Sequence, residues 1–216
     1  MGNTTMRKSE INKFFSHVLV INLDRRPDRM EQLIPELTFH NIEASRISAI
    51  DGKTVYPELK NIYRGWLGCT LSHINALTWA KQNKLSNILI IEDDVRFSEI
   101  NLMELPTIIE ELPNDWDMFY LGANDKHPKT ILNQYSKHLR KAEFLLTTHA
   151  YAVNAKCYDV LINHLQSNCT TVVDVLYTQL QPQLKCYLAT PILAWQAEGF
   201  SDILNQNVNY DFMKPL

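Results

Sequence analysis

Glycine is scarce in this sequence: the 216 residues include only six. Neither the spaced glycine triplet of dinucleotide-binding folds nor the glycine-rich P-loop with its lysine occurs. The sequence therefore excludes a Rossmann cofactor site and a P-loop nucleotide site. Long apolar runs are missing too, because none is longer than that of residues 88–91, which is far too short to cross a bilayer. We expect no integral membrane segment.

The four cysteines are too dispersed for a zinc ribbon or a redox dithiol, since no two stand three positions apart. We expect four reduced thiols. Residues 1–15 are polar and lack the apolar core of a secretory signal. We therefore expect a cytoplasmic protein, and association with a membrane surface stays open.

The charges nearly balance, with 21 Lys and Arg against 24 Asp and Glu and a net charge of −3. This composition argues against a nucleic-acid-binding protein, which usually carries a basic excess. A hydrophobic content of 45% indicates a globular chain. We expect a polar leader without fixed structure over residues 1–15 and one domain over residues 16–216, whose oligomeric state the sequence leaves open.

Apolar runs and helical periodicities alternate along the chain, and this alternation predicts an α/β fold with a mostly parallel central sheet flanked by helices. The tail after residue 189 carries no predicted element, and residues 122–141 are expected to form a mobile loop. The predicted strands are residues 17–23, 44–50, 87–91, 118–121, 144–153 and 185–189, and the predicted helices are residues 27–37, 67–83, 102–112, 156–165 and 173–180.

Three consecutive carboxylates, Glu92, Asp93 and Asp94, follow the predicted strand at residues 87–91. Ligands of open α/β sheets bind at the carboxyl ends of strands, and neighbouring carboxylates are costly to hold together without a cation. Oxygen ligands suit Mn²⁺ or Mg²⁺. In an extended segment Glu92 and Asp94 point the same way, so they can share one ion while Asp93 faces elsewhere. The alternative is that the acidic residues merely end a strand.

Four blocks of sequence resemble, in order, those of glycosyltransferase family 25, which includes lipopolysaccharide and collagen galactosyltransferases. They are residues 20–29 (VINLDRRPDR), 48–52 (SAIDG), 68–73 (GCTLSH) and 88–95 (ILIIEDDV), and weaker likenesses continue at residues 150–153, 173–174 and 196–203. The resemblance implies a single-domain GT-A type fold and a donor that is usually a uridine diphosphate hexose.

The resemblance also implies that the acidic triplet is the family's metal motif, commonly written D-x-D. Here its first position is Glu92 rather than Asp. We assign Asp94 first and Glu92 second as ligands of Mn²⁺ or Mg²⁺, which would stabilise the charge of the leaving phosphate. Asp93 is expected to orient donor hydroxyls or to complete the strand end.

Five further residues are candidates for binding the donor. Arg25 and Arg29 suit uridine or phosphate contacts, although arginines at the start of a helix are commonly solvated. Asp51 suits uracil or ribose, or a turn-stabilising role. Ser72 and His73 lie near the start of a predicted helix, from which they can reach the sugar or diphosphate.

An inverting transfer needs a general base to remove the acceptor's proton. The resemblance favours Asp174, although a carboxylate at a helix start is often only a cap. In the tail, Gln196, Ser201 and Asp202 are expected to close over donor or acceptor.

These assignments predict a metal-dependent glycosyltransferase that moves galactose or glucose from a uridine diphosphate sugar to a saccharide, a glycoprotein or a hydroxylysine-type acceptor. Two alternatives stay open. One is a metal-dependent phosphohydrolase using the same carboxylates, although residues 22–24 (NLD) lack the nucleophilic Asp of an Asp-x-Asp strand motif. The other is a non-catalytic sugar-binding or protein-binding relative.

Overall fold

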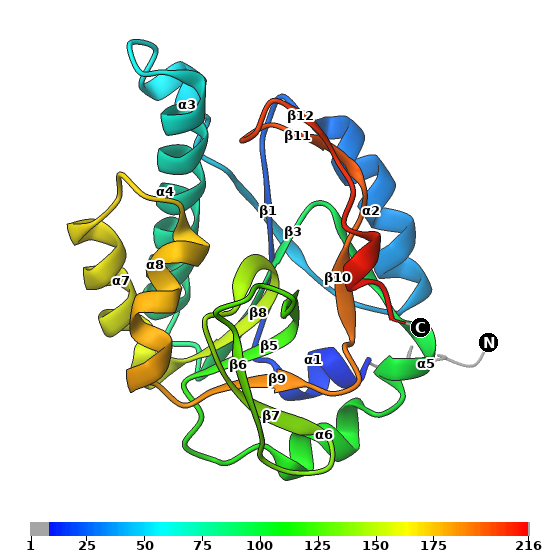
Figure 1. Cartoon of the computed structure of the whole chain (residues 1–216). Coiled ribbons are helices and arrows are strands. Elements are labelled where there is room, and N and C mark those ends of the chain that lie inside the picture. Colours follow the sequence, from blue (N-terminus) through cyan, green and yellow to red (C-terminus); the bar gives the residue numbers. More distant parts are fainter. Residues whose placement is uncertain (1–8, 216) are drawn as a thin grey trace.

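An eight-stranded sheet forms the centre of the computed structural model, which describes residues 9–215 (Figure 1). Only β7 and β8 run against the other six strands, so the predicted α/β fold with a mostly parallel sheet is confirmed. In spatial order the strands are β2 (Ser45–Ser48), β1 (Val18–Asn22), β3 (Asn87–Glu92), β8 (Leu146–Asn154), β5 (Met118–Asn124), β9 (Cys186–Ala189), β7 (Leu139–Glu143) and β6 (Ile131–Gln134).

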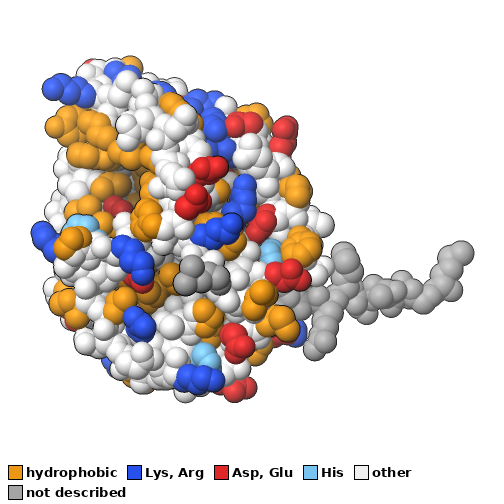
Figure 2. All heavy atoms as spheres, turned by 45° about the vertical axis from the view of Figure 1, so that its right-hand side comes forward, with side chains coloured by type: hydrophobic (Ala, Val, Ile, Leu, Met, Phe, Trp, Pro, Cys, Tyr) orange, Lys and Arg blue, Asp and Glu red, His pale blue; other side chains and the backbone are white. Residues whose placement is uncertain are grey.

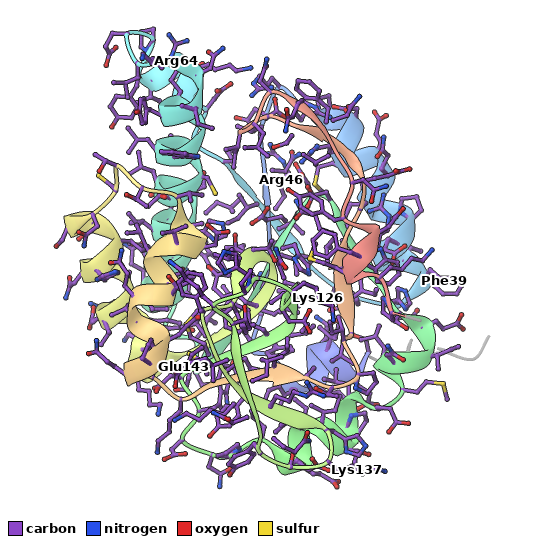
Figure 3. All side chains as sticks on the ribbon, in the orientation of Figure 1. Phe39, Arg46, Arg64, Lys126, Lys137 and Glu143 are labelled. Carbon is purple, nitrogen blue, oxygen red and sulfur yellow. The ribbon has the colours of Figure 1, made fainter. Side chains whose placement is uncertain are left out.

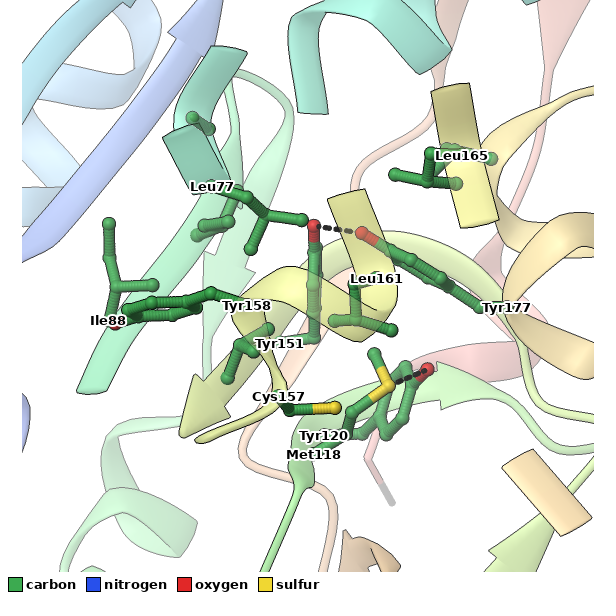
Figure 4. Packing of buried hydrophobic residues seen from close by; sticks show 14 of the residues in the cluster. Leu77, Ile88, Met118, Tyr120, Tyr151, Cys157, Tyr158, Leu161, Leu165 and Tyr177 are labelled. Carbon is green, nitrogen blue, oxygen red and sulfur yellow. Dashed lines mark hydrogen bonds between the residues drawn. The ribbon is translucent and has the colours of Figure 1, made fainter. Parts of the chain in front are cut away.

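Helices cover both faces of the sheet, and each face has its own core. The first core lies under α4 (Asn61–Gln82), α7 (Tyr158–Ser167) and α8 (Val173–Leu180), and the second under α1 (Glu10–Phe14), α2 (Pro27–Phe39) and α6 (Leu105–Glu111). Alternate side chains of β1 enter alternate cores, so Leu19 packs in the first and Val20 in the second. Figure 4 shows part of the first core, where Tyr120, Tyr151 and Tyr177 lie among aliphatic side chains.

Short helices, strands and turns complete the fold. They are α3 (Gly52–Val55), β4 (Val95–Phe97) paired with β10 (Ala194–Gln196), α5 (Glu99–Leu102), the hairpin of β11 (Gly199–Ser201) and β12 (Gln206–Val208), and the 3-10 turns η1 (Ala155–Cys157), η2 (Gln181–Gln183) and η3 (Asp211–Met213). The β11–β12 hairpin lies between α2 and the amino-terminal end of α4 in Figure 1.

The leader and the segment over residues 122–141 differ from expectation. Residues 1–8 lie outside the described residues, but α1 belongs to the domain because Ile11 and Phe15 are buried in the second core. The segment predicted as a loop holds the end of β5 and the β6–β7 hairpin, which buries Leu139 and Ala142. Because β6 is largely exposed, its sequence lacks the alternation of apolar and polar residues that would predict a strand.

Two helices also differ from expectation. The helix predicted from residue 67 begins at Asn61, six residues earlier, because its first turns carry glycine and polar residues that obscure the apolar period. The helix predicted for residues 102–112 is α6, which begins only at Leu105, and Leu102 belongs to the separate short helix α5. Pro106 lies in the first turn of α6, where its missing N–H is tolerated, so a new helix starts there. Figure 3 labels Arg64 near the start of α4 and Arg46, which belongs to β2.

Candidate active site

A pocket lies at the carboxyl ends of β1 and β3, between the start of α4 and the β11–β12 hairpin. Eleven of the twelve predicted site residues line it, and only Asp174 does not. The eleven come from segments distributed over most of the chain: Arg25, Arg29, Asp51, Ser72, His73, Glu92, Asp93, Asp94, Gln196, Ser201 and Asp202. The topology therefore brings together the candidates that the sequence keeps apart.

Glu92 is the last residue of β3, and the protein holds one of its carboxylate oxygens. Thr148 on β8 donates its hydroxyl to Oε1 at 2.6 Å, and Nε2 of His73 lies 3.5 Å from the same oxygen. Burial raises the pKa of Glu92, but these partners outweigh it and the net shift is downward. Glu92 is therefore held as a carboxylate.

Asp94 also has one occupied oxygen. Its Oδ2 accepts from Gln196 at 3.0 Å and from Arg29 at 3.3 Å, whereas Oδ1 is buried with no partner among the described residues. Burial, followed by the charge of Glu92, raises the pKa of Asp94 to about 7. A buried carboxylate oxygen without a donor is costly, so this atom calls for a positive partner.

Asp93 points to different partners from those of Glu92, as the alternation along an extended segment predicts. It accepts from the amide of Asn22 at 2.6 Å and from Arg29 at 2.6 Å, and its side chain is 7% exposed. Burial raises its pKa despite these bonds. Arg46 in turn donates to Oδ1 of Asn22 at 2.8 Å, so a bonded row of side chains fixes Asp93.

The residues present fit a divalent cation in their chemistry. Glu92 and Asp94 each keep one oxygen that accepts no hydrogen bond from a described residue, and both side chains line the pocket. No group of three or more His, Cys, Asp or Glu within residues 9–215 is arranged as a complete metal site. A cation here would take two carboxylates and draw its remaining ligands from water or substrate, as Mg²⁺ and Mn²⁺ usually do.

Arginines from the start of α2 tie the β11–β12 hairpin to the pocket wall. Arg25 donates to Asp51 and to Asp202, both at 2.6 Å, and Arg26 also donates to Asp202. Arg29 donates to the carbonyl of Phe200 at 2.7 Å. The hairpin is therefore held over the pocket by charged bonds.

Two of the residues that were predicted to contact the sugar donor, Ser72 and Asp51, form hydrogen bonds within the protein. Ser72 is buried, donates to the carbonyl of Gly68 at 2.6 Å and accepts from the amide of Ile50 at 2.8 Å. Asp51 caps α3 through the amide of Lys53 at 3.0 Å, so the turn-stabilising alternative holds beside its contact with Arg25. Ser72 and His73 lie in the middle of α4 and not near its start, which corrects their predicted position.

Asp174 lies in the first turn of α8, outside the pocket lining. Its two oxygens accept backbone N–H groups, from Thr147 at 3.0 Å and from Val175 at 2.8 Å. Burial raises its pKa, and the charge of Glu92 adds to the shift. The cap-like interpretation therefore has direct contacts in its favour, and its role as a base stays a prediction.

Glycines shape the wall of the pocket, where four of the six in the chain are found. A Cβ on Gly52 would lie 1.9 Å from the carbonyl oxygen of Arg64, and one on Gly68 would lie 2.5 Å from that of Ile50. A Cβ on Gly65 would lie 2.9 Å from Cα of Ile203 in the hairpin. The scarce glycines thus allow α4 to approach the rest of the pocket wall closely.

The sequence pattern of glycosyltransferase family 25 (LPS biosynthesis protein) matches residues 15–177. The chain belongs to this family. This family 25 chain is 30% identical to procollagen galactosyltransferase 2 of Mus musculus over 165 residues, which are 65% of this chain and 26% of that protein. It is 29% identical over 136 residues to the inactive glycosyltransferase 25 family member 3 of Homo sapiens, covering 53% of this chain and 23% of that protein. The chain therefore spans about a quarter of the length of the curated relatives it matches.

Solved structures agree with the fold. A glycosyltransferase involved in the glycosylation of the major capsid of PBCV-1 superposes with a TM-score of 0.50 at 10% identity, covering 88% of this chain and 95% of the other. None of the helices within residues 9–215 is both long and apolar enough to cross a membrane. On the face shown in Figure 2, acidic and basic side chains are interspersed rather than separated by sign.

The sequence analysis missed several residues of this family 25 site. Asn22 and Arg46 orient Asp93, and Thr148, Tyr151 and Tyr177 lie behind Glu92 and His73. Asn22 had a usable signal, because a polar residue that ends a strand of four apolar residues is typical of a site. The tyrosines had none, because buried aromatic residues in a strand and a helix look like ordinary core.

Proposed function

We propose that this chain is a metal-dependent glycosyltransferase that moves a hexose, galactose or glucose, from a uridine diphosphate sugar to a saccharide or hydroxylysine-type acceptor. One observation carries the proposal: Glu92 and Asp94, at the end of β3, line the same pocket, and Asp94 keeps a buried oxygen that has no partner among the described residues. Family 25 membership and the galactosyltransferase relatives support the choice of reaction.

Mn²⁺ or Mg²⁺ held by Asp94 and Glu92 would supply positive charge to the leaving diphosphate. The other contacts with the donor come from side chains of the protein. Arg25 and Arg29 line the same pocket, and their guanidinium groups can pair with phosphate oxygens. Asp93, fixed by Asn22 and Arg29, presents a rigid acceptor of hydrogen bonds to donor hydroxyls.

The β11–β12 hairpin contributes by covering the pocket. Residues 199, 201, 202 and 203 line it, so a bound donor would be enclosed between this hairpin and α4. Excluding water in this way favours transfer to an acceptor over hydrolysis of the donor. If the transfer inverts the sugar, Asp174 remains the proposed base.

A non-catalytic role is the second candidate, because one matched relative is named as inactive. Release of uridine diphosphate distinguishes the two. We expect the wild-type protein to hydrolyse or transfer galactose or glucose from its uridine diphosphate form in the presence of Mn²⁺, and guanosine diphosphate sugars to be poor donors. Asp94→Asn should lower kcat/KM by about 100-fold or more, the scale of losing one electrostatic contact in a transition state.

Asp159→Asn is the matched control, because Asp159 lies on the exposed surface, where it pairs with Lys81. It should retain wild-type turnover. The transferase assignment fails if no nucleotide sugar is turned over, or if Asp94→Asn and Asp159→Asn behave alike. Donor binding without turnover would establish the non-catalytic role instead.

A further inference from the structure

A row of hydrogen-bonded side chains runs through the first core behind Glu92. His73 on α4, Tyr151 on β8 and Tyr177 on α8 are each no more than 1% exposed. Nδ1 of His73 lies 2.8 Å from the hydroxyl of Tyr151, which lies 3.0 Å from the hydroxyl of Tyr177. Figure 4 shows the bond between the two tyrosines, surrounded by apolar side chains such as Leu77 and Leu161. Polar groups buried in this way are normally hydrogen-bonded, and here they bond to one another.

The row has a direction, which follows from the number of protons available. Nε2 of His73 faces the Oε1 oxygen of Glu92 at 3.5 Å. A carboxylate only accepts, so the nitrogen facing it must carry the proton. Nδ1 of a neutral His73 then accepts from Tyr151, and the oxygen of Tyr151 accepts from Tyr177. The donors are Tyr177, Tyr151 and His73, in that order, and Glu92 ends the row as an acceptor.

The reverse direction leaves a conflict. A proton on Nδ1 alone would place the lone pair of Nε2 against the carboxylate of Glu92. Burial raises the pKa of both Tyr151 and Tyr177, so their hydroxyls stay protonated and able to donate. His73 therefore presents an N–H to Glu92 whether the ring is neutral or doubly protonated.

We propose that His73, oriented by Tyr151 and Tyr177, is a positioning residue that holds Oε1 of Glu92 and so leaves Oε2 available to a divalent cation in the pocket. Residues that hydrogen-bond to a metal ligand generally fix the orientation of that ligand, and the row fixes Glu92 in the same way. The side chain of Glu92 has one more rotatable bond than that of the neighbouring Asp94, so it has more freedom to be fixed. His73 is accordingly a support for the metal ligand and not a contact of the donor sugar. The inference rests on the proposed metal-dependent function.

Tyr151→Phe tests the proposal, with Tyr120→Phe as the matched control. Both tyrosines are buried in the same core and their rings stack at 6.1 Å. The hydroxyl of Tyr120 accepts from Gln181 at 3.0 Å and takes no part in the row to Glu92. Each variant loses one buried hydroxyl that has two partners, which are His73 and Tyr177 for Tyr151 and Gln181 and Met118 for Tyr120. General effects on the fold are therefore matched.

Two measurements read the result. Nitrogen NMR of the metal-free protein should show the Nε2–H form of His73 in the wild type and in Tyr120→Phe, and a mixture of ring forms in Tyr151→Phe. Electron paramagnetic resonance of free Mn²⁺, without donor, should show affinity about 10-fold weaker for Tyr151→Phe, the lower end of the range for losing an outer partner of a ligand. Tyr177→Phe should shift affinity in the same direction by less.

The outcomes separate the two proposals. A wild-type protein that does not bind Mn²⁺ overturns the metal-dependent function and, with it, the purpose assigned to His73. Wild-type binding that weakens equally in Tyr151→Phe and Tyr120→Phe overturns only the positioning role. An Nδ1–H form of His73 in the wild type would also overturn it, whatever the Mn²⁺ affinity.

Discussion

Asp202 fastens the β11–β12 hairpin over the pocket, and replacing it by Asn should loosen the hairpin. The side chain of Asp202 is 13% exposed and accepts from Arg25 at 2.6 Å and from Arg26. The hydrogen bonds and charges of these arginines outweigh burial and lower the pKa of Asp202, so the carboxylate is charged at neutral pH. Asp202→Asn removes that charge while keeping the shape of the side chain.

The magnitude follows from two charge-assisted bonds. A buried bond to a charged group contributes about 1.5–3 kcal/mol, but an exposed ion pair contributes only about 0.2–1 kcal/mol. Arg25 is 36% exposed and Arg26 20%, so an intermediate value of about 1 kcal/mol for each bond is appropriate. The total of about 2 kcal/mol corresponds to roughly a 30-fold shift toward the open hairpin, at about 1.4 kcal/mol for each factor of ten.

Amide hydrogen exchange measures this shift, because protected amides exchange in proportion to the opening equilibrium. The reporter is the amide of Ala197, two residues before β11, which donates to the carbonyl of Asp94 in the pocket wall at 2.8 Å. Its exchange should accelerate by roughly 30-fold in Asp202→Asn, since 2 kcal/mol of lost closure converts to that factor. Asp28→Asn is the control, because Asp28 pairs with the same Arg26 but not with the hairpin. Equal acceleration in both variants, or none in either, would refute the fastening role.

Two further predictions concern stability. Gly68→Ala places a Cβ 2.5 Å from the carbonyl oxygen of Ile50. Overpacking of about 2 kcal/mol, reduced by the helix propensity of alanine, should lower the free energy of unfolding in urea by about 1 kcal/mol. Gly199→Ala, which meets nothing within 4 Å, should change it by less than about 0.5 kcal/mol, and equal losses would contradict the packing argument. Bonds from Ser136 and His138 lower the pKa of Glu111 from 4.5 to about 2. A carboxylate whose pKa is lowered by folding stabilises the fold at pH values above its ordinary pKa, and this gain disappears as the pH falls toward the folded-state pKa. Glu111→Gln should therefore reduce the free energy of unfolding at neutral pH and flatten the decline of that free energy between pH 4.5 and about 2. Urea titrations across that range measure both effects. An unchanged slope would mean that these bonds do not favour the charged form.

The strands and the acidic end of β3 were predictable because their signals are local. Residues 18–21 and 88–91 are continuous aliphatic runs, which favour a strand buried on both faces, and the carboxylates follow at the end where α/β sheets bind ligands. The β6–β7 hairpin was not predictable in this way. Its outer strand is mostly exposed and polar, so it carries no alternation that separates it from a loop.

The bonds that assemble the site were less predictable than its residues. Arg25 and Asp202 are 177 positions apart, and His73 and Tyr151 are 78 apart. The positions taken by Tyr151 and Tyr177 would suit any large apolar side chain, so their hydroxyls gave no indication of a row leading to Glu92. The family resemblance placed Ser72 and His73 in a functional block. Only the tertiary fold shows that both side chains form hydrogen bonds within the protein.

The arginines of the pocket link occupancy by a donor to the position of the hairpin. Arg25 is already paired with Asp51 and Asp202, and Arg29 with Asp93 and the carbonyl of Phe200. A diphosphate that uses either guanidinium must therefore compete with a group of the protein, and two of those groups belong to the hairpin. Coupling of this kind is reciprocal, so Asp202→Asn should bind uridine diphosphate more tightly while its hairpin exchanges faster. A calorimetric titration that finds weaker binding in this variant would mean that Asp202 supports the bound phosphate rather than competing with it.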